Sequence, residues 1–251
     1  MRLVQDYNLL QGTGADALAA IALLTLATSG ITLLVRQRGR DAATYYPDLA
    51  WLRALVYFSA ALILSWSLGV SQSLLGQPLF TDAQLQSPVW VGFTLFYLVV
   101  LWVGYGILWP RGTFSDERLA HPLLNTLYGL LWGLCHGQVF LCFWALAERT
   151  GLNSYWVAGI TYLLLSGYNF CYHQFFWDRK VSPPHNYEAW NLKKVQLCHA
   201  PNLLLGLTWL ALWGNFGLWL LLQTAALSLC VYCMRFPAWY DDYRAVAGET
   251  R

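Results

Sequence analysis

The sequence is poor in charged residues. Asp, Glu, Lys and Arg make up 11% of its 251 residues, against roughly 25% in ordinary soluble domains. Apolar residues make up 57%, which excludes both an ordinary soluble domain and a disordered chain. The 15 basic residues nearly balance the 13 acidic ones, so net charge gives no basis for nucleic-acid binding. We therefore expect an integral membrane protein.

Several other features are missing from the sequence. It has no long linker, low-complexity stretch or convincing internal repeat, which favours a single domain over residues 1–251. The six cysteines lie in or at the ends of apolar segments, where free cysteine behaves as a small hydrophobic residue, so a disulfide framework is not expected. No acidic or basic residue falls deep inside an apolar segment, which argues against a proton pump, a voltage sensor or an ion-coupled carrier.

The sequence does contain a series of apolar windows of the length that a membrane helix needs, about 20 residues. Seven windows fit and predict an all-α, multi-pass bundle. The last two are separated only at Gly214–Gly217, where Gly and Asn favour a tight turn. One long helix there would give six spans instead. The predicted spans are 16–35, 51–71, 88–109, 122–146, 153–176, 195–214 and 215–234.

The basic residues predict the orientation of the bundle. Seven alternating spans place 13 of the 15 on one side, in 36–50, 110–121, 177–194, the C-terminal tail and Arg53, and leave only Arg2 and Arg149 on the other. Six spans would divide them 10 to 5. Because basic loops stay in the cytoplasm, the charges favour seven spans, with the N-terminus outside and the C-terminus cytoplasmic.

Uncharged polar and aromatic residues recur at helical spacing on three consecutive predicted spans. Because polar side chains are costly against lipid, we expect these faces to meet and enclose a pocket for a hydrophobic small molecule. Hydrogen bonding between helices is the competing interpretation, and His136 alone is more typical of a neutral core histidine. The three faces are His121, Asn125, Gly129, Trp132 and His136; Tyr155, Tyr162, Ser166, Asn169 and His173; and His199, Asn202, Gly206, Trp209 and Trp213.

Gly129, Gly133 and Gly137 form two overlapping GxxxG steps. Such steps allow another helix to approach the backbone closely. The glycine face therefore predicts a helix partner, from this chain or from another membrane subunit.

Histidines and acidic residues gather near the predicted cytoplasmic interface. His173, His185, Glu188 and His199 form a ligand set suited to iron or zinc, although they match no HxxxH or HExxH spacing. A metal-free site is equally open, with His185 or His199 as base and Glu188 as acid. Lys193 and Lys194 would then hold an anionic headgroup, and a basic interfacial segment at 177–194 that only contacts membrane lipids is the plainest alternative.

The favoured function is an enzyme that modifies a lipid or isoprenoid-type substrate at this cluster, with an aromatic-lined path for its apolar tail. One alternative is a non-catalytic protein that binds a pigment, haem or quinone or assembles a membrane complex. Another is a carrier of a neutral or hydrophobic solute. The predicted substrate-binding residues are Asn125, Trp132, His136, Tyr162, Asn169, Lys193, Lys194, Asn202 and Trp209.

Overall fold

A computed structural model describes residues 3–4, 47–109, 122–171 and 195–233. Every regular element in these ranges is helical, which confirms the all-α prediction for this part of the chain. The elements are α3 (Pro47–Ser67), α4 (Val70–Gly76), α5 (Asp82–Leu85), α6 (Pro88–Leu101), η3 (Trp102–Leu108), α8 (Pro122–Glu148), α9 (Ser154–Cys171), η7 (Val195–His199), α11 (Ala200–Trp213) and α12 (Phe216–Cys233).

Helices occupy most of the described residues in six of the seven ranges predicted as spans, whereas residues 172–176 of the fifth, residue 234 of the last and all of 16–35 lie outside the described residues. Two helices, Pro88–Leu108 and Thr126–Glu148, are long and apolar enough to cross a membrane. Leu55–Ser67 and Val70–Gly76 make a third candidate if the two are taken as one span bent by 75°. The described residues therefore contain two to three candidate membrane helices, and Leu197–Trp213 and Phe216–Cys230 are shorter apolar helices.

Local chemistry explains where the helices begin and end. Ser87 caps α6 by accepting a hydrogen bond from the backbone N–H of Trp90, and Pro88 occupies the first turn, where its missing N–H costs nothing. Gly214 ends α11 in the left-handed conformation (φ 66°), which glycine adopts without steric penalty. The chain reverses there, so α11 and α12 are two helices, as the turn prediction at 214–217 required.

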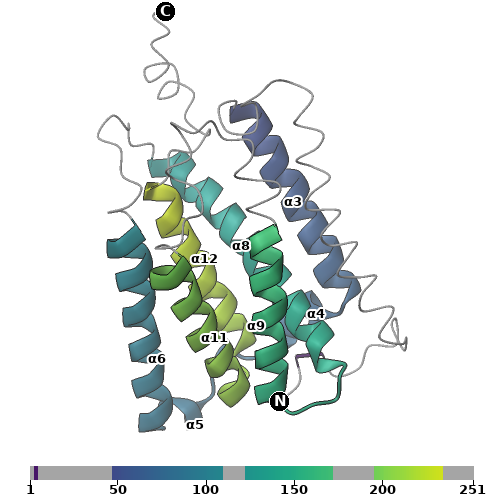
Figure 1. The fold of residues 1–251 in the computed structure, drawn as a ribbon, viewed down its shortest axis with the longest axis vertical. Coiled ribbons are helices and arrows are strands. Elements are labelled where there is room, and N and C mark those ends of the chain that lie inside the picture. Colours follow the sequence, from purple (N-terminus) through teal and green to yellow (C-terminus); the bar gives the residue numbers. More distant parts are fainter. Residues whose placement is uncertain (1–2, 5–46, 110–121, 172–194, 234–251) are drawn as a thin grey trace, which may run out of the picture.

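The helices run alternately up and down the bundle. In Figure 1, α3, α8 and α11 end at the lower end, where α6, α9 and α12 begin. Contacts at that end agree with this arrangement, because Asn215, in the turn between α11 and α12, exchanges hydrogen bonds with Gln84 of α5 and accepts one from Trp90 of α6. The connections at 77–87, 149–153 and 214–215 thus share one end of the bundle.

Leu3 and Val4 are held at the same lower end. The backbone N–H of Leu3 lies 2.8 Å and 3.0 Å from the two carboxylate oxygens of Glu148, at the end of α8. Gln77 donates to the Leu3 carbonyl, and the Leu3 side chain is fully buried. Trp144 also donates to Glu148, at 2.8 Å. One carboxylate thus holds the first residues against the bundle.

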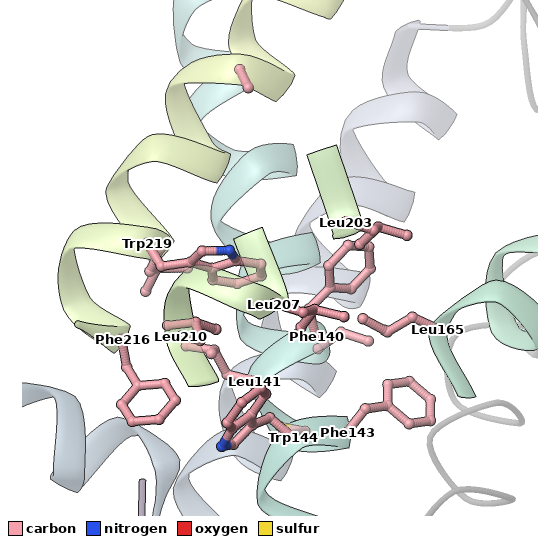
Figure 2. Packing of buried hydrophobic residues seen from close by; sticks show 14 of the residues in the cluster. Phe140, Leu141, Phe143, Trp144, Leu165, Leu203, Leu207, Leu210, Phe216 and Trp219 are labelled. Atoms are coloured by element: carbon pink, nitrogen blue, oxygen red, sulfur yellow. The ribbon is translucent and has the colours of Figure 1, made fainter. Parts of the chain in front are cut away.

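One hydrophobic core joins α8, α9, α11 and α12. Figure 2 shows side chains from all four helices meeting in it, and most of α8 is buried along its length. Burial of large aromatic side chains such as Trp144 and Trp219, each at most 1% exposed, contributes much of the packing contact. The labelled residues are Phe140, Leu141, Phe143, Trp144, Leu165, Leu203, Leu207, Leu210, Phe216 and Trp219.

The glycine face of α8 packs against α12. A Cβ atom added at Gly133 would lie 2.8 Å from the Cα and carbonyl oxygen of Thr224, and one at Gly129 would lie 2.8 Å from the Cα of Ser228. A Cβ at Gly137 would meet the side chain of Leu220. The close approach that the GxxxG steps predicted is made within the chain, because only glycine leaves room for α12 at this distance.

We expect Gly133→Ala to destabilise the protein by about 1–3 kcal/mol, because the new methyl group meets the backbone of α12, which has no rotamer with which to yield. Gly159→Ala is the matched control, since nothing lies within 4 Å of a Cβ at that position, and alanine favours a helix by up to about 1 kcal/mol. Thermal unfolding in detergent measures both. Equal unfolding midpoints for the two variants would contradict the close contact.

Candidate functional site

Most of the predicted histidine and carboxylate cluster lies outside the described residues. This applies to His173, His185, Glu188, Lys193 and Lys194, and also to the side chain of Asn125. Of the four predicted metal ligands, the structure describes only His199. Within the described ranges, no group of three or more His, Cys, Asp or Glu side chains could hold a metal ion. The iron or zinc site therefore stays a prediction.

His199 is the last residue of η7 and precedes α11. Its ring is half-buried. The Nδ1 atom lies 3.0 Å from the hydroxyl of Tyr105, and the ring meets Trp109 edge-on with centroids 4.9 Å apart. Hydrogen bonding on one side and ring packing on the other thus fix the orientation of this imidazole.

Tyr105 and His199, which share the hydrogen bond, lie on two adjacent π-helical segments. Tyr105 belongs to η3 and His199 to η7, and Cys198 of η7 donates to the carbonyl of Gly104 in η3 at 3.1 Å. The two segments pack closely, because a Cβ at Gly104 would lie in van der Waals contact with the Cα of Cys198, at 3.6 Å. π-Helical turns are uncommon and occur frequently at functional sites.

Behind Tyr105 lies a buried polar network on α6, α11 and α12. Asn202 accepts from the Tyr97 hydroxyl at 2.8 Å and donates to the Tyr105 hydroxyl at 3.1 Å. Gln223 of α12 donates to Tyr97 at 2.6 Å and exchanges two hydrogen bonds with Asn202, at 2.8 Å and 2.9 Å. All four side chains are at most 3% exposed. The network therefore satisfies two buried amides and two buried hydroxyls without water.

Trp209 lies further along α11, toward the lower end. Its indole N–H donates to Thr94 of α6 at 3.2 Å, and its ring packs beside those of Trp90 and Tyr97. The side chain is completely buried. The predicted polar face of 195–214 thus meets α6 and, through Asn202, η3 and α12.

The predicted face of 122–146 meets different neighbours. The rings of Trp132 and His136 both pack against Tyr57 of α3, with centroids 5.3 Å and 5.5 Å away. The hydroxyl of Tyr57 lies 3.1 Å from that of Tyr168 on α9. Asn169 is also buried. The structure therefore brings Trp132 and His136 together with α3, and Asn202 and Trp209 together with α6.

Three residues of this site were absent from the predicted set: Tyr97, Tyr105 and Gln223. Gln223 offered a usable signal, because it is a lone amide in the apolar run of α12, and an amide in such a helix needs a partner inside the bundle. Tyr97 and Tyr105 lie inside the predicted span 88–109, for which no polar face was predicted. Their burial could not be read from composition.

Comparison with known proteins adds no relative: no family model, no curated protein and no solved structure matches this chain.

We expect Asn202→Leu to lower the free energy of unfolding by about 2–4 kcal/mol. The substitution removes four hydrogen bonds and leaves two hydroxyls and an amide buried without these partners, at about 0.5–1 kcal/mol for each bond.

Thr208→Val is the control on the same helix, because the Thr208 hydroxyl donates to the carbonyl of Leu204 one turn earlier. Removing this hydrogen bond should lower the free energy of unfolding by less than about 0.5 kcal/mol. Chemical unfolding in detergent measures both variants. If Asn202→Leu unfolds at the wild-type denaturant concentration, the network does not hold the helices together.

Proposed function

We propose that the chain is a seven-span membrane protein with its N-terminus outside and its basic loops in the cytoplasm. Exposed apolar side chains support a lipid-facing surface, including Ile63 on α3, Val89 on α6 and Leu163 on α9, each 68–72% exposed. Water would penalise such surfaces on three helices of one bundle, whereas lipid would not.

The position of Leu3 supports the seventh span. Leu3 lies at the lower end of the bundle beside Glu148, whereas α3 begins at the upper end (Figure 1). The intervening chain must therefore join opposite ends of the bundle, and an odd number of crossings does this. The apolar segment 16–35 has the length of one crossing.

We expect a reporter enzyme that folds only in an oxidising compartment to be active when inserted after Gly151 and inactive when inserted after Gly112. The reason is that the first site lies between α8 and α9, at the end shared with Leu3, and the second lies in a basic loop. A fluorescent protein that folds only in the cytoplasm should give the reverse pattern at the same two sites. Activity of one reporter at both sites would contradict the proposed threading.

For the chemistry, we propose that the protein modifies a lipid or isoprenoid-type substrate at the cytoplasmic end, with His185, Glu188 and His199 as reactive groups. The observation that carries this is the placement of His199, whose imidazole is oriented by Tyr105 and Trp109 where two π-helical segments meet. An oriented imidazole is what proton transfer to or from a substrate requires.

In this proposal the substrate tail lies along the outer side of α11. Leu197 and Leu204 flank His199 in sequence and are 53% and 59% exposed, so an acyl or isoprenoid chain in the membrane can reach them. Trp132 and Trp209, by contrast, already pack against protein side chains. The proposal therefore puts the tail at the lipid-facing side of His199, with Lys193 and Lys194 near its headgroup.

The metal version of this proposal uses His173, His185, Glu188 and His199 as ligands of iron or zinc, which would supply a Lewis acid at the same end of the bundle. Elemental analysis of purified protein tests it, because a bound metal would be stoichiometric. A visible absorption band in the same preparation would instead favour a haem or pigment carrier.

We expect His185→Ala, Glu188→Ala and His199→Ala each to lower product formation by at least about 100-fold, the usual contribution of a general acid or base. Mass spectrometry of lipid extracts from membranes with and without the protein identifies the species that it converts. Thr208→Val should leave the conversion unchanged, since its hydroxyl bonds within α11.

Lipid profiles that are the same for wild type and all three alanine variants, with no metal and no absorption band, would reject the enzyme and leave binding or transport of a hydrophobic solute.

A further inference from the structure

The hydrogen bonds of Asn202 and Gln223 form a closed set in which every amide hydrogen has an acceptor. The two N–H bonds of Gln223 point to Tyr97 and to the Asn202 carbonyl oxygen. Those of Asn202 point to the Gln223 carbonyl oxygen and to Tyr105. Because Tyr97 donates its own proton to Asn202, the hydroxyl proton of Tyr105 is the one donor left to assign.

The orientation of the two amides gives the direction of the last hydrogen bond, between Tyr105 and His199. A tyrosine hydroxyl has one proton to donate. Tyr105 accepts from Asn202 on one side, so its proton is available for the other side, where Nδ1 of His199 lies at 3.0 Å. With the amides in this orientation Nδ1 is the acceptor, and in a neutral imidazole the proton then lies on Nε2.

We infer that Tyr105, oriented by Asn202 and Gln223, is a positioning residue that holds His199 as the neutral Nε2–H tautomer. The network is anchored on α11 and α12 and shielded from water, since Tyr105 is 1% exposed and Gln223 is 1% exposed. For Tyr105 to accept a hydrogen bond from His199 instead, the side-chain amides of Asn202 and Gln223 would both have to turn over, because each donates to the other and accepts from it.

The tautomer specifies what His199 offers to a ligand, and this role rests on the proposed function. A protonated Nε2 donates a hydrogen bond to an oxygen, such as that of a carbonyl, hydroxyl or phosphate headgroup. It does not ligate a metal, because a metal bound through Nε2 needs the proton on Nδ1, where a second group then accepts it. This tautomer therefore makes His199 a donor to substrate oxygen and removes it from the ligand set of the metal version proposed above, in which His173, His185 and Glu188 remain.

Nitrogen NMR of protein labelled with ¹⁵N-histidine tests the inference, since protonated and unprotonated ring nitrogens have well-separated shifts. His199 is assigned by the signals that disappear in His199→Gln. We expect Nε2 to be protonated and Nδ1 unprotonated at neutral pH. Tyr105→Phe keeps the ring and removes the donor, so the single-tautomer spectrum should be lost.

Two further variants separate positioning from packing. Asn202→Asp replaces the amide donor that faces Tyr105 with a carboxylate oxygen, so Tyr105 donates to it and the proton of His199 should move to Nδ1. Tyr97→Phe is the matched control, because Gln223 still orients Asn202, and the Nε2–H tautomer should persist. Thermal unfolding of each variant checks that it is folded.

A wild-type spectrum with the proton on Nδ1, or a Tyr105→Phe spectrum identical to wild type, would overturn the inference. The wild-type spectrum decides by itself if Tyr105→Phe does not fold. The spectrum needs no activity, so the two proposals fail separately. An Nε2–H tautomer in a protein with unchanged lipids rejects only the enzyme, and an Nδ1–H tautomer in an active enzyme rejects only this inference.

Discussion

The side chains of Asn202 and Gln223 bond to each other twice, and the helices on one side of the bundle are positioned by what these two amides contact. An amide buried away from water costs free energy unless it is hydrogen-bonded, so an amide in the core must be satisfied by a neighbouring group. Here α11 and α12 satisfy each other and also Tyr97 and Tyr105. Moving any of these helices would leave several buried groups without hydrogen-bond partners at once. The network therefore holds the helices in their positions.

The other side of the bundle is held by shape instead. α8 and α12 approach until the backbones of Gly133 and Thr224 nearly touch, and such contact gains dispersion energy over a large area. α12 thus takes part in both halves: its glycine-facing side packs on α8, and Gln223 reaches across to α11. Close packing against α8 and hydrogen bonding to α11 therefore both involve α12. Through Asn202, this helix also helps to position Tyr105, the partner of His199.

The positions of most described helices along the sequence were predictable, because the length of an apolar segment and the residues at its turns act locally. The break at Gly214 and the close approach at Gly133 are examples, and both follow from the absence of a Cβ. The neighbours of each face were less predictable. Periodicity placed Asn202, Trp209 and His136 on polar faces, but membrane helices are apolar all round, so nothing local indicated that α6 would face Asn202 or that α3 would face His136.

The π-helical geometry of η3 and η7 had no sequence signal that we could use, since one inserted residue per turn leaves the composition unchanged. Tyr105 was missed for this reason, because the pairing of Tyr105 with His199 depends on those two turns. Residues 177–194, where the sequence predicts His185 and Glu188 as reactive groups, lie outside the described part of the chain. The described geometry therefore bears on His199 alone.

The contact between Leu3 and Glu148 joins residues 145 positions apart in the chain. A ribosome adds about 5–20 residues per second, so on the order of 10 s separates the synthesis of Leu3 from that of Glu148. During that interval the backbone N–H of Leu3 has no carboxylate to bind. This contact at the lower end of the bundle can therefore form only after α8 has been made, although Leu3 itself is made much earlier.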